Sequence, residues 1–205
     1  MTAPDAAVDA KTKTTLRGQA LLARNTLDEA DRSRFSDRIA EGAAEIVGSL
    51  RPICVALYRP IGSECDTHAL MVKVTALGAF LALPAIIDKT TIVFRRFALG
   101  DALVSGGFGT SFPATEVPVV EPDVIVLPVV AFDRTGTRLG YGRGYYDRAI
   151  SRQREAGYDP RLVGIAFAVQ EVALIPDETH DIRLDWVVTE REILDFAGMQ
   201  PAGEA

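Results

Sequence analysis

The chain has 205 residues, of which 48% are hydrophobic and 24% are charged, a composition typical of a globular protein with one buried core. Its net charge of −6 argues against a nonspecific nucleic-acid binder, although a local group of arginines can still bind a small anion. No segment predicts a signal peptide or a membrane span, and Cys54 and Cys65 have no metal-ligand spacing. We therefore expect a cytoplasmic protein with reduced thiols and neither membrane nor nucleic-acid partners.

The N-terminal third predicts two helices, a strand and a third helix. Apolar residues at helical spacing indicate a first helix over 11–27. Thr26 followed by Glu29 forms a capping-box pattern, so we expect the second helix to begin there. The apolar run "ICVALY" at 53–58 predicts a buried strand, and a helix capped by Asp66 or Thr67 should extend to about Leu77.

The rest of the chain alternates further strands with a loop and one more helix. The expected strands are "AFLALP" at 79–84, "TIVFRRF" at 91–97, "DVIVLP" at 123–128, "LVGIAFA" at 162–168 and "DWVVTE" at 185–190. Residues 100–118 should be mostly loop, and a helix is expected from about Gly144 to Ala156. Continuous apolar strands alternating with helices predict an α/β domain with a mainly parallel sheet covered on both faces. We expect one domain over 11–195, with flexible tails at 1–10 and 196–205.

The stretch "FDRTGTRLGYGRGYYDRAI" at 132–150 carries four glycines among arginines. Its glycine loop (residues 133–144) follows an expected strand and precedes a helix, which is where open α/β sheets bind ligands. Free N–H groups at a helix start attract phosphate oxygens, and Arg138, Arg143 and Arg148 could bind the same oxygens. The glycines alone leave a second interpretation open, a surface turn with solvated arginines, because neither a P-loop nor a GxGxxG pattern is present.

The order GTRLGYGRGYYDR resembles the signature of the 5-formyltetrahydrofolate cyclo-ligase family, whose members are also called 5,10-methenyltetrahydrofolate synthetases. Three other segments resemble the family's elements in the same order: "KTTLR" at 13–17, "YRPIGSECDT" at 58–67 and "HDIRLDWVVTE" at 180–190. The resemblance implies a three-layer α/β sandwich of the NagB/RpiA/CoA transferase type. It also implies a C–N ring-forming ligase that uses ATP and Mg²⁺ to convert 5-formyltetrahydrofolate to 5,10-methenyltetrahydrofolate.

The resemblance also assigns roles to individual residues. The expected ATP-binding residues are Lys13, Thr14, Thr15, Leu16, Arg17, Arg138, Leu139, Gly140, Tyr141, Gly142, Arg143, Gly144, Tyr145 and Tyr146. The expected folate-binding residues are Arg59, Glu64, Gly142, Arg143, Gly144, Tyr145 and Tyr146. The expected catalytic residues are Lys13, Arg143 and Tyr146. The resemblance assigns Mg²⁺ binding to Asp147 and Asp181. Mg²⁺ commonly takes one or two carboxylates and completes its shell with phosphates and water.

Several alternatives stay open at the level of sequence. Without the resemblance, Lys13 and Arg17 are solvated helix charges, and Asp147 is an acid that the dipole of a helix favours in its first turn. Arg143 stands where many relatives have Lys or Gly, and the chemistry requires no role for His180. A paralog that activates a different amide, for example in salvage of a thiamine-type metabolite, and a non-catalytic folate- or nucleotide-binding protein are the competing functions. We expect a monomer or a weak homodimer.

Overall fold

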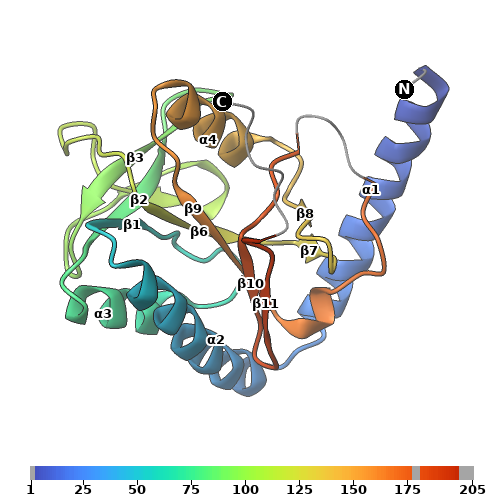
Figure 1. Cartoon of the computed structure of the whole chain (residues 1–205), viewed down its shortest axis with the longest axis horizontal. Helices are drawn as coiled ribbons and strands as arrows, with labels where there is room; N and C mark the ends of the chain where they lie inside the picture. The colour runs from blue at the N-terminus through green and yellow to red at the C-terminus, as the bar shows by residue number, and fades with distance from the viewer. Residues whose placement is uncertain (1–2, 177–180, 199–205) are drawn as a thin grey trace.

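In the computed structural model, which describes residues 3–176 and 181–198, a seven-stranded sheet lies between helices (Figure 1). The strands, in spatial order, are β11 (Ile193–Asp195), β10 (Trp186–Val188), β9 (Arg161–Ile165), β6 (Val124–Pro128), β1 (Cys54–Ala56), β2 (Phe80–Ile86) and β3 (Ile92–Phe97). The inner five run parallel, and β3 and β11 pair antiparallel at the two edges. The expected α/β sandwich with a mainly parallel sheet is confirmed.

Helices cover both faces of the sheet, and its inner strands are accordingly apolar at nearly every position, Arg161 at the start of β9 being an exception. The helices α2 (Glu29–Leu50) and α3 (His68–Ala76) lie on one face, and α4 (Tyr145–Glu155) lies on the other (Figure 1). Successive side chains of a strand point to opposite faces. In β1, Val55 packs in the cluster with α2 and α3, whereas Cys54 and Ala56 pack in the cluster with α4.

The first helix, α1 (Ala3–Asn25), lies outside these layers, beside a small hairpin at the carboxyl end of β6 (Figure 1). The hairpin is formed by β7 (Ala131–Phe132) and β8 (Arg138–Leu139). A separate apolar cluster joins the helix to the hairpin through Ala20, Ala131 and Leu139. This packing holds α1 against the glycine loop.

Two expected helix starts were wrong. The helix expected to begin near Lys11 begins at Ala3, so part of the expected N-terminal tail is helical, in keeping with the high helix propensity of its four alanines. The N-cap of α2 is Asp28 rather than Thr26, because the Asp28 carboxylate accepts a hydrogen bond from Asp31 N at 2.7 Å. At the other end, Phe196 is buried, which corrects the expected start of the C-terminal tail. The rest of that tail, 199–205, and His180 lie outside the described residues.

Short elements also went unpredicted. The expected loop at 100–118 contains β4 (Val104–Ser105), the 3-10 turn η1 (Gly107–Gly109) and β5 (Ser111–Phe112). The β7–β8 hairpin and the edge strand β11 were missed as well, because strands of two or three residues are too short to show a periodic pattern. Within the described part of the chain, no helix has the length and apolar character needed to cross a bilayer.

Candidate active site

One face of α1 carries three cations. Lys13, Arg17, Ala20 and Arg24 follow one another at intervals of three or four residues, so they lie along one side of the helix. Two of the cations are buried, with Lys13 6% exposed and Arg24 5% exposed. A buried cation is costly unless it is hydrogen-bonded or paired. All three cations have such partners in segments far away in the sequence.

Lys13 forms an ion pair with Asp181, with Nζ 2.6 Å from Oδ2. The Asp181 side chain keeps about a fifth of its surface exposed. The pair brings the first helix next to the segment that precedes β10, two parts of the chain 168 residues apart. Two of the residues expected to contact ATP and metal therefore meet directly.

Arg17 contacts the glycine loop itself. Its Nε donates to the carbonyl oxygen of Gly140 at 2.8 Å, and a Cβ built on Gly142 would lie 3.6 Å from Arg17 Cζ. Gly142 has φ +86° and Gly144, the N-cap of α4, has φ +63°, a region of φ that side chains disfavour. Glycine is required at these two positions so that the chain can turn into the helix.

Arg138 joins the loop to the Asp147 carboxylate and to the backbone next to Asp181. One guanidinium nitrogen donates to Asp147 Oδ1 at 2.7 Å, and another donates to the carbonyl oxygen of Ile182, the residue after Asp181. The Arg138 side chain is almost fully buried, while that of Asp147 is about one third exposed. Arg138 thus holds the first turn of α4 and the segment at 181–182 close together.

Glu64 lies between the loop after β1 and the glycine loop, with only 8% of its surface exposed. Its Oε1 accepts a hydrogen bond from the hydroxyl of Tyr141 at 2.9 Å, and its Oε2 accepts one from Ile61 N at 2.8 Å. Burial raises the pKa of Glu64 above its ordinary value, and the donors Ile61 and Tyr141 and the charge of Arg24 oppose that rise. The carboxylate is therefore held in one orientation at the edge of the site.

A model of the 5-formyltetrahydrofolate cyclo-ligase family matches residues 9–190. The chain belongs to this family. The match includes all four segments on which the resemblance rested, and these are the segments that meet around the glycine loop. The family assignment and the geometry therefore concern the same residues.

Individual cyclo-ligases and synthetases resemble the chain over most of its length. The 5-formyltetrahydrofolate cyclo-ligase of Mycolicibacterium smegmatis is 29% identical over 188 residues, covering 87% of this chain and 94% of the relative. That of Escherichia coli K12 is 31% identical over 148 residues, covering 69% and 80%. The NMR structure of Aquifex aeolicus 5,10-methenyltetrahydrofolate synthetase superposes with a TM-score of 0.78 at 31% identity, covering 94% of this chain and 96% of that one. The synthetase of Mycoplasma pneumoniae has the same fold, with a TM-score of 0.70 at 23% identity.

The helix α4 begins with two tyrosines, Tyr145 and Tyr146. Both are partly buried against the α4 cluster, and the Tyr146 ring lies 6.5 Å from that of Phe94, centroid to centroid. Burial, followed by the charge of Glu64, raises the pKa of Tyr146. Arg148 lies over the Tyr145 ring and donates to Arg143 O at 2.6 Å. It therefore fixes the backbone of the loop.

The remaining cyclo-ligase positions divide into packed and exposed residues. Leu16 and Leu139 pack in the cluster between α1 and the hairpin, so they support the loop from beneath. Exposed side chains occur at Thr14, Thr15, Arg59 and Arg143. Of these, Arg143 lies between Gly142 and Gly144, which places its backbone in the glycine loop.

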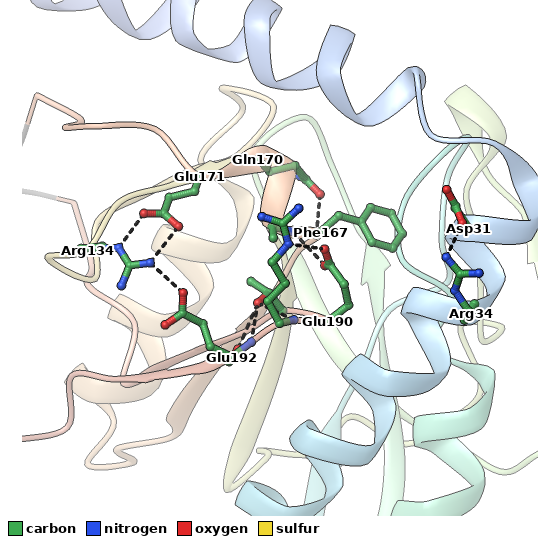
Figure 2. A network of polar contacts seen from close by, with 11 residues as sticks. Asp31, Arg34, Arg134, Phe167, Gln170, Glu171, Glu190 and Glu192 are labelled. Atoms are coloured by element: carbon green, nitrogen blue, oxygen red, sulfur yellow. Dashed lines mark hydrogen bonds and ion pairs between the residues drawn. The ribbon is translucent and has the colours of Figure 1, made fainter.

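Figure 2 shows a polar network in which Arg134 contacts Glu171 and Glu192. Arg134, in the hairpin turn, donates to Glu171 Oε1 at 2.7 Å and to Glu192 Oε1 at 2.7 Å. These bonds connect the hairpin to the turn after η2 (Ala168–Gln170) and to the turn between β10 and β11. Next to it, the fully buried Asp133 accepts from the backbone N–H of Thr135 at 2.9 Å.

Sequence reasoning missed Arg24 and Ser63. Arg24 Nε donates to Ser63 Oγ at 2.9 Å, and Arg24 Nη2 donates to the Tyr141 hydroxyl at 3.0 Å. A signal was present, because Arg24 falls between Ala20 and Leu27 on the face of α1 that was expected to be apolar. A cation in an apolar stripe indicates a buried polar partner.

The donor set around the loop suits a metal ion that arrives with a phosphate ligand. Asp147 and Asp181 are two carboxylates, and the described residues contain no group of three His, Cys, Asp or Glu side chains able to hold a metal alone. Mg²⁺ needs only one or two protein carboxylates when phosphates complete its shell. The residues present fit that kind of site.

A shallow hollow of about 250 Å³ lies elsewhere, at the amino end of β1, lined by residues that include Arg51, Ile53 and Leu77. It contains one charged side chain and no set of converging polar groups, so we assign it no part in the chemistry.

Proposed function

We propose that this protein is an ATP-dependent 5-formyltetrahydrofolate cyclo-ligase that forms 5,10-methenyltetrahydrofolate, ADP and phosphate. Membership of the family supports the proposal. The observation that carries it is the convergence of three distant segments on the glycine loop. Arg17 donates to Gly140 O, Tyr141 donates to Glu64, and Arg138 donates to Ile182 O, next to the Asp181 that pairs with Lys13.

The chemistry has to overcome the inertness of an amide. The formyl carbon of the substrate is a poor electrophile, and its oxygen is a poor leaving group. Transfer of the γ-phosphoryl group of ATP to the formyl oxygen breaks the bond to ADP and makes the carbon iminium-like. N10 then attacks that carbon, its proton is lost, and the C–O bond breaks so that the oxygen departs with phosphate. The protein's part is mostly positioning and charge neutralisation.

In this proposal, ATP lies on the glycine loop. The N–H groups at the start of α4 and the dipole of this helix attract the phosphate oxygens. Lys13 supplies a positive charge from α1, and Arg17 orients the loop through Gly140. Arg143, exposed between two glycines, is assigned to the transferred phosphoryl group. A rigid set of donors costs little reorganisation during transfer.

The folate lies next to the triphosphate, against Glu64 and the tyrosines of the loop. A carboxylate with two fixed oxygens can accept two hydrogen bonds from the amino-pyrimidine edge of a pterin. Tyr145 and Tyr146 offer an aromatic surface for the ring system. Arg59, exposed five residues before Glu64, is placed by the resemblance beside the same substrate.

Asp147 and Asp181 would hold Mg²⁺ together with the ATP phosphates. An ion held there would supply positive charge against the phosphate oxygens of the nucleotide. The protein contributes two carboxylates, each already oriented by a cation, Arg138 or Lys13. Both carboxylates are therefore held by a cation before the nucleotide binds.

A direct assay tests the proposal. Purified protein is mixed with 5-formyltetrahydrofolate and MgATP, and the near-ultraviolet absorbance of the methenyl product is followed. Product that requires both ATP and the folate is the expected result. ATP binding without product would favour the paralog with a different amide substrate, and binding of both ligands without any turnover would favour a non-catalytic protein. We further propose that the enzyme acts in the cytoplasm as a monomer or weak homodimer.

A further inference from the structure

Arg24 is a buried cation with no carboxylate partner within ion-pair distance in the described chain. It is 5% exposed, yet its partners are two hydroxyls, those of Ser63 and Tyr141. Burying a guanidinium without a direct anion is costly. The nearby Glu64 carboxylate is connected to it through the Tyr141 hydroxyl, which accepts from Arg24 and donates to Glu64 Oε1.

Tyr141 has a ring and a hydroxyl in different environments. The residue is 51% exposed, but its hydroxyl lies between Arg24 and Glu64. Burial and the charge of Glu64 raise the pKa of the Tyr141 hydroxyl, so it remains a donor to the carboxylate at physiological pH. Its polar end is therefore committed to the protein, and only its ring is available to a ligand.

We propose that Arg24 is a positioning residue for Glu64, acting through the hydroxyl of Tyr141. The inference rests on the proposed function, in which Glu64 binds the folate. Two parts of α1 then have different roles. The part with Lys13 and Arg17 supports the triphosphate site, and the part with Arg24 supports the folate site. Ser63 anchors the second nitrogen of Arg24, which fixes the direction in which the guanidinium points.

The charge of Arg24 also acts on the protonation of Glu64. The ionised carboxylate is the form that can accept two hydrogen bonds from a pterin edge. Burial favours the protonated form, and Arg24 favours the ionised one. Among the described residues, the charge of Glu64 also acts on Tyr58, Cys65, Tyr141 and Tyr146. None of these four is a cation, whereas Arg24 carries a positive charge that acts on Glu64.

Arg24→Met and Tyr141→Phe test the inference. Each should raise the KM for 5-formyltetrahydrofolate by about tenfold or more, the scale for losing a hydrogen bond to a buried charge, and leave the KM for ATP unchanged. The double variant should resemble either single one, because both act through the same carboxylate. In Arg24→Met the acid limb of kcat/KM for the folate should move to higher pH, because the pKa of Glu64 is no longer lowered by the cation.

Arg34→Met is the matched control. Arg34 is exposed and pairs with Asp31 at the start of α2, so this variant should keep both KM values and the pH profile. If Arg24→Met does not fold, the Tyr141→Phe variant tests the inference instead. Tyr141 is half exposed, so its substitution should leave the fold intact. Unchanged folate KM values, an increase in the KM for ATP instead, or an unmoved acid limb would each overturn the inference.

Equilibrium binding separates this inference from the proposed function. Calorimetric titration with 5-formyltetrahydrofolate needs no turnover, so it is run on the wild type and the same variants. If the wild type binds the folate but makes no methenyl product, the proposed function falls, and weaker binding in Arg24→Met still supports the positioning role. Equal binding in wild type, Arg24→Met and Tyr141→Phe overturns the role. A wild type that does not bind the folate overturns both.

Discussion

Lys13 Nζ lies 2.6 Å from Asp181 Oδ2, and this ion pair joins α1 to a segment 168 residues later. Both residues stand in segments that resemble the cyclo-ligase family, and nothing in their local sequence predicts that they touch. Because Lys13 is buried, its charge acts in a weakly screened environment. Removing the Lys13 charge should weaken the use of ATP more than it lowers the stability of the fold.

Lys13→Ala should lower kcat/KM for ATP about thirtyfold, equivalent to about 2 kcal/mol for one charge-assisted contact. The KM for 5-formyltetrahydrofolate should change little. Lys11→Ala is the control, since Lys11 is exposed two residues earlier on the same helix. Equal ATP kinetics in the two variants would remove Lys13 from the nucleotide site.

Asp147→Asn should reduce turnover on the order of a hundredfold, the scale for one lost electrostatic contact in a transition state. The fold should persist, because the amide oxygen can still accept from Arg138. The measurement is kcat as a function of Mg²⁺ concentration. Asp159→Asn removes an exposed carboxylate that pairs with Arg154 beyond the other end of α4, and it should behave as wild type. An Asp147→Asn variant with wild-type turnover and Mg²⁺ dependence would refute the metal assignment.

Gly142→Ala should impair ATP binding and also cost about 1–2 kcal/mol of unfolding free energy, because an alanine is strained at positive φ. Gly157, just after α4, has φ +88° with open space around it, so Gly157→Ala should show the same loss of stability with normal ATP binding. Thermal unfolding and ATP titration of the two variants separate strain from function. A Gly142→Ala variant that binds ATP as tightly as wild type would show that the loop does not need this conformation.

The thiols of Cys54 and Cys65 should be inert in the folded protein. Both are buried, and burial raises the pKa of each to about 12, so almost no thiolate exists at pH 8. Ellman's reagent should titrate two thiols per chain in denaturant and essentially none under native conditions. Rapid reaction of either thiol in the native enzyme would contradict its placement in the core.

The inner sheet could be predicted because parallel strands covered on both faces are apolar at every position. The run "DVIVLP" is such a strand, and β6 occupies 124–128 of it. The β7–β8 hairpin could not be found this way, since each strand has two residues. The hairpin is held by contacts outside itself, because Ala131 and Leu139 pack against α1 and Phe132 is buried in the cluster with α4.

The segments that surround the glycine loop could be singled out from the sequence, but the contacts between them could not. The glycine loop and the charged residues in the family-like segments do come together. Arg24 was missed because its two partners lie 39 and 117 residues away. For Arg138 the sequence predicts contact with ATP, which stays a prediction. The structure adds that its guanidinium already binds Asp147 and the carbonyl of Ile182.

The position of the bound nucleotide decides whether the glycine loop holds the triphosphate. A crystal structure of the protein with Mg²⁺, a non-hydrolysable ATP analogue and 5-formyltetrahydrofolate would give it. We predict the triphosphate within hydrogen-bond distance of the backbone at 140–144, with Lys13 beside it and the pterin against Glu64. A triphosphate bound away from Gly142 and Asp147, for example in the hollow at the amino end of β1, would contradict it.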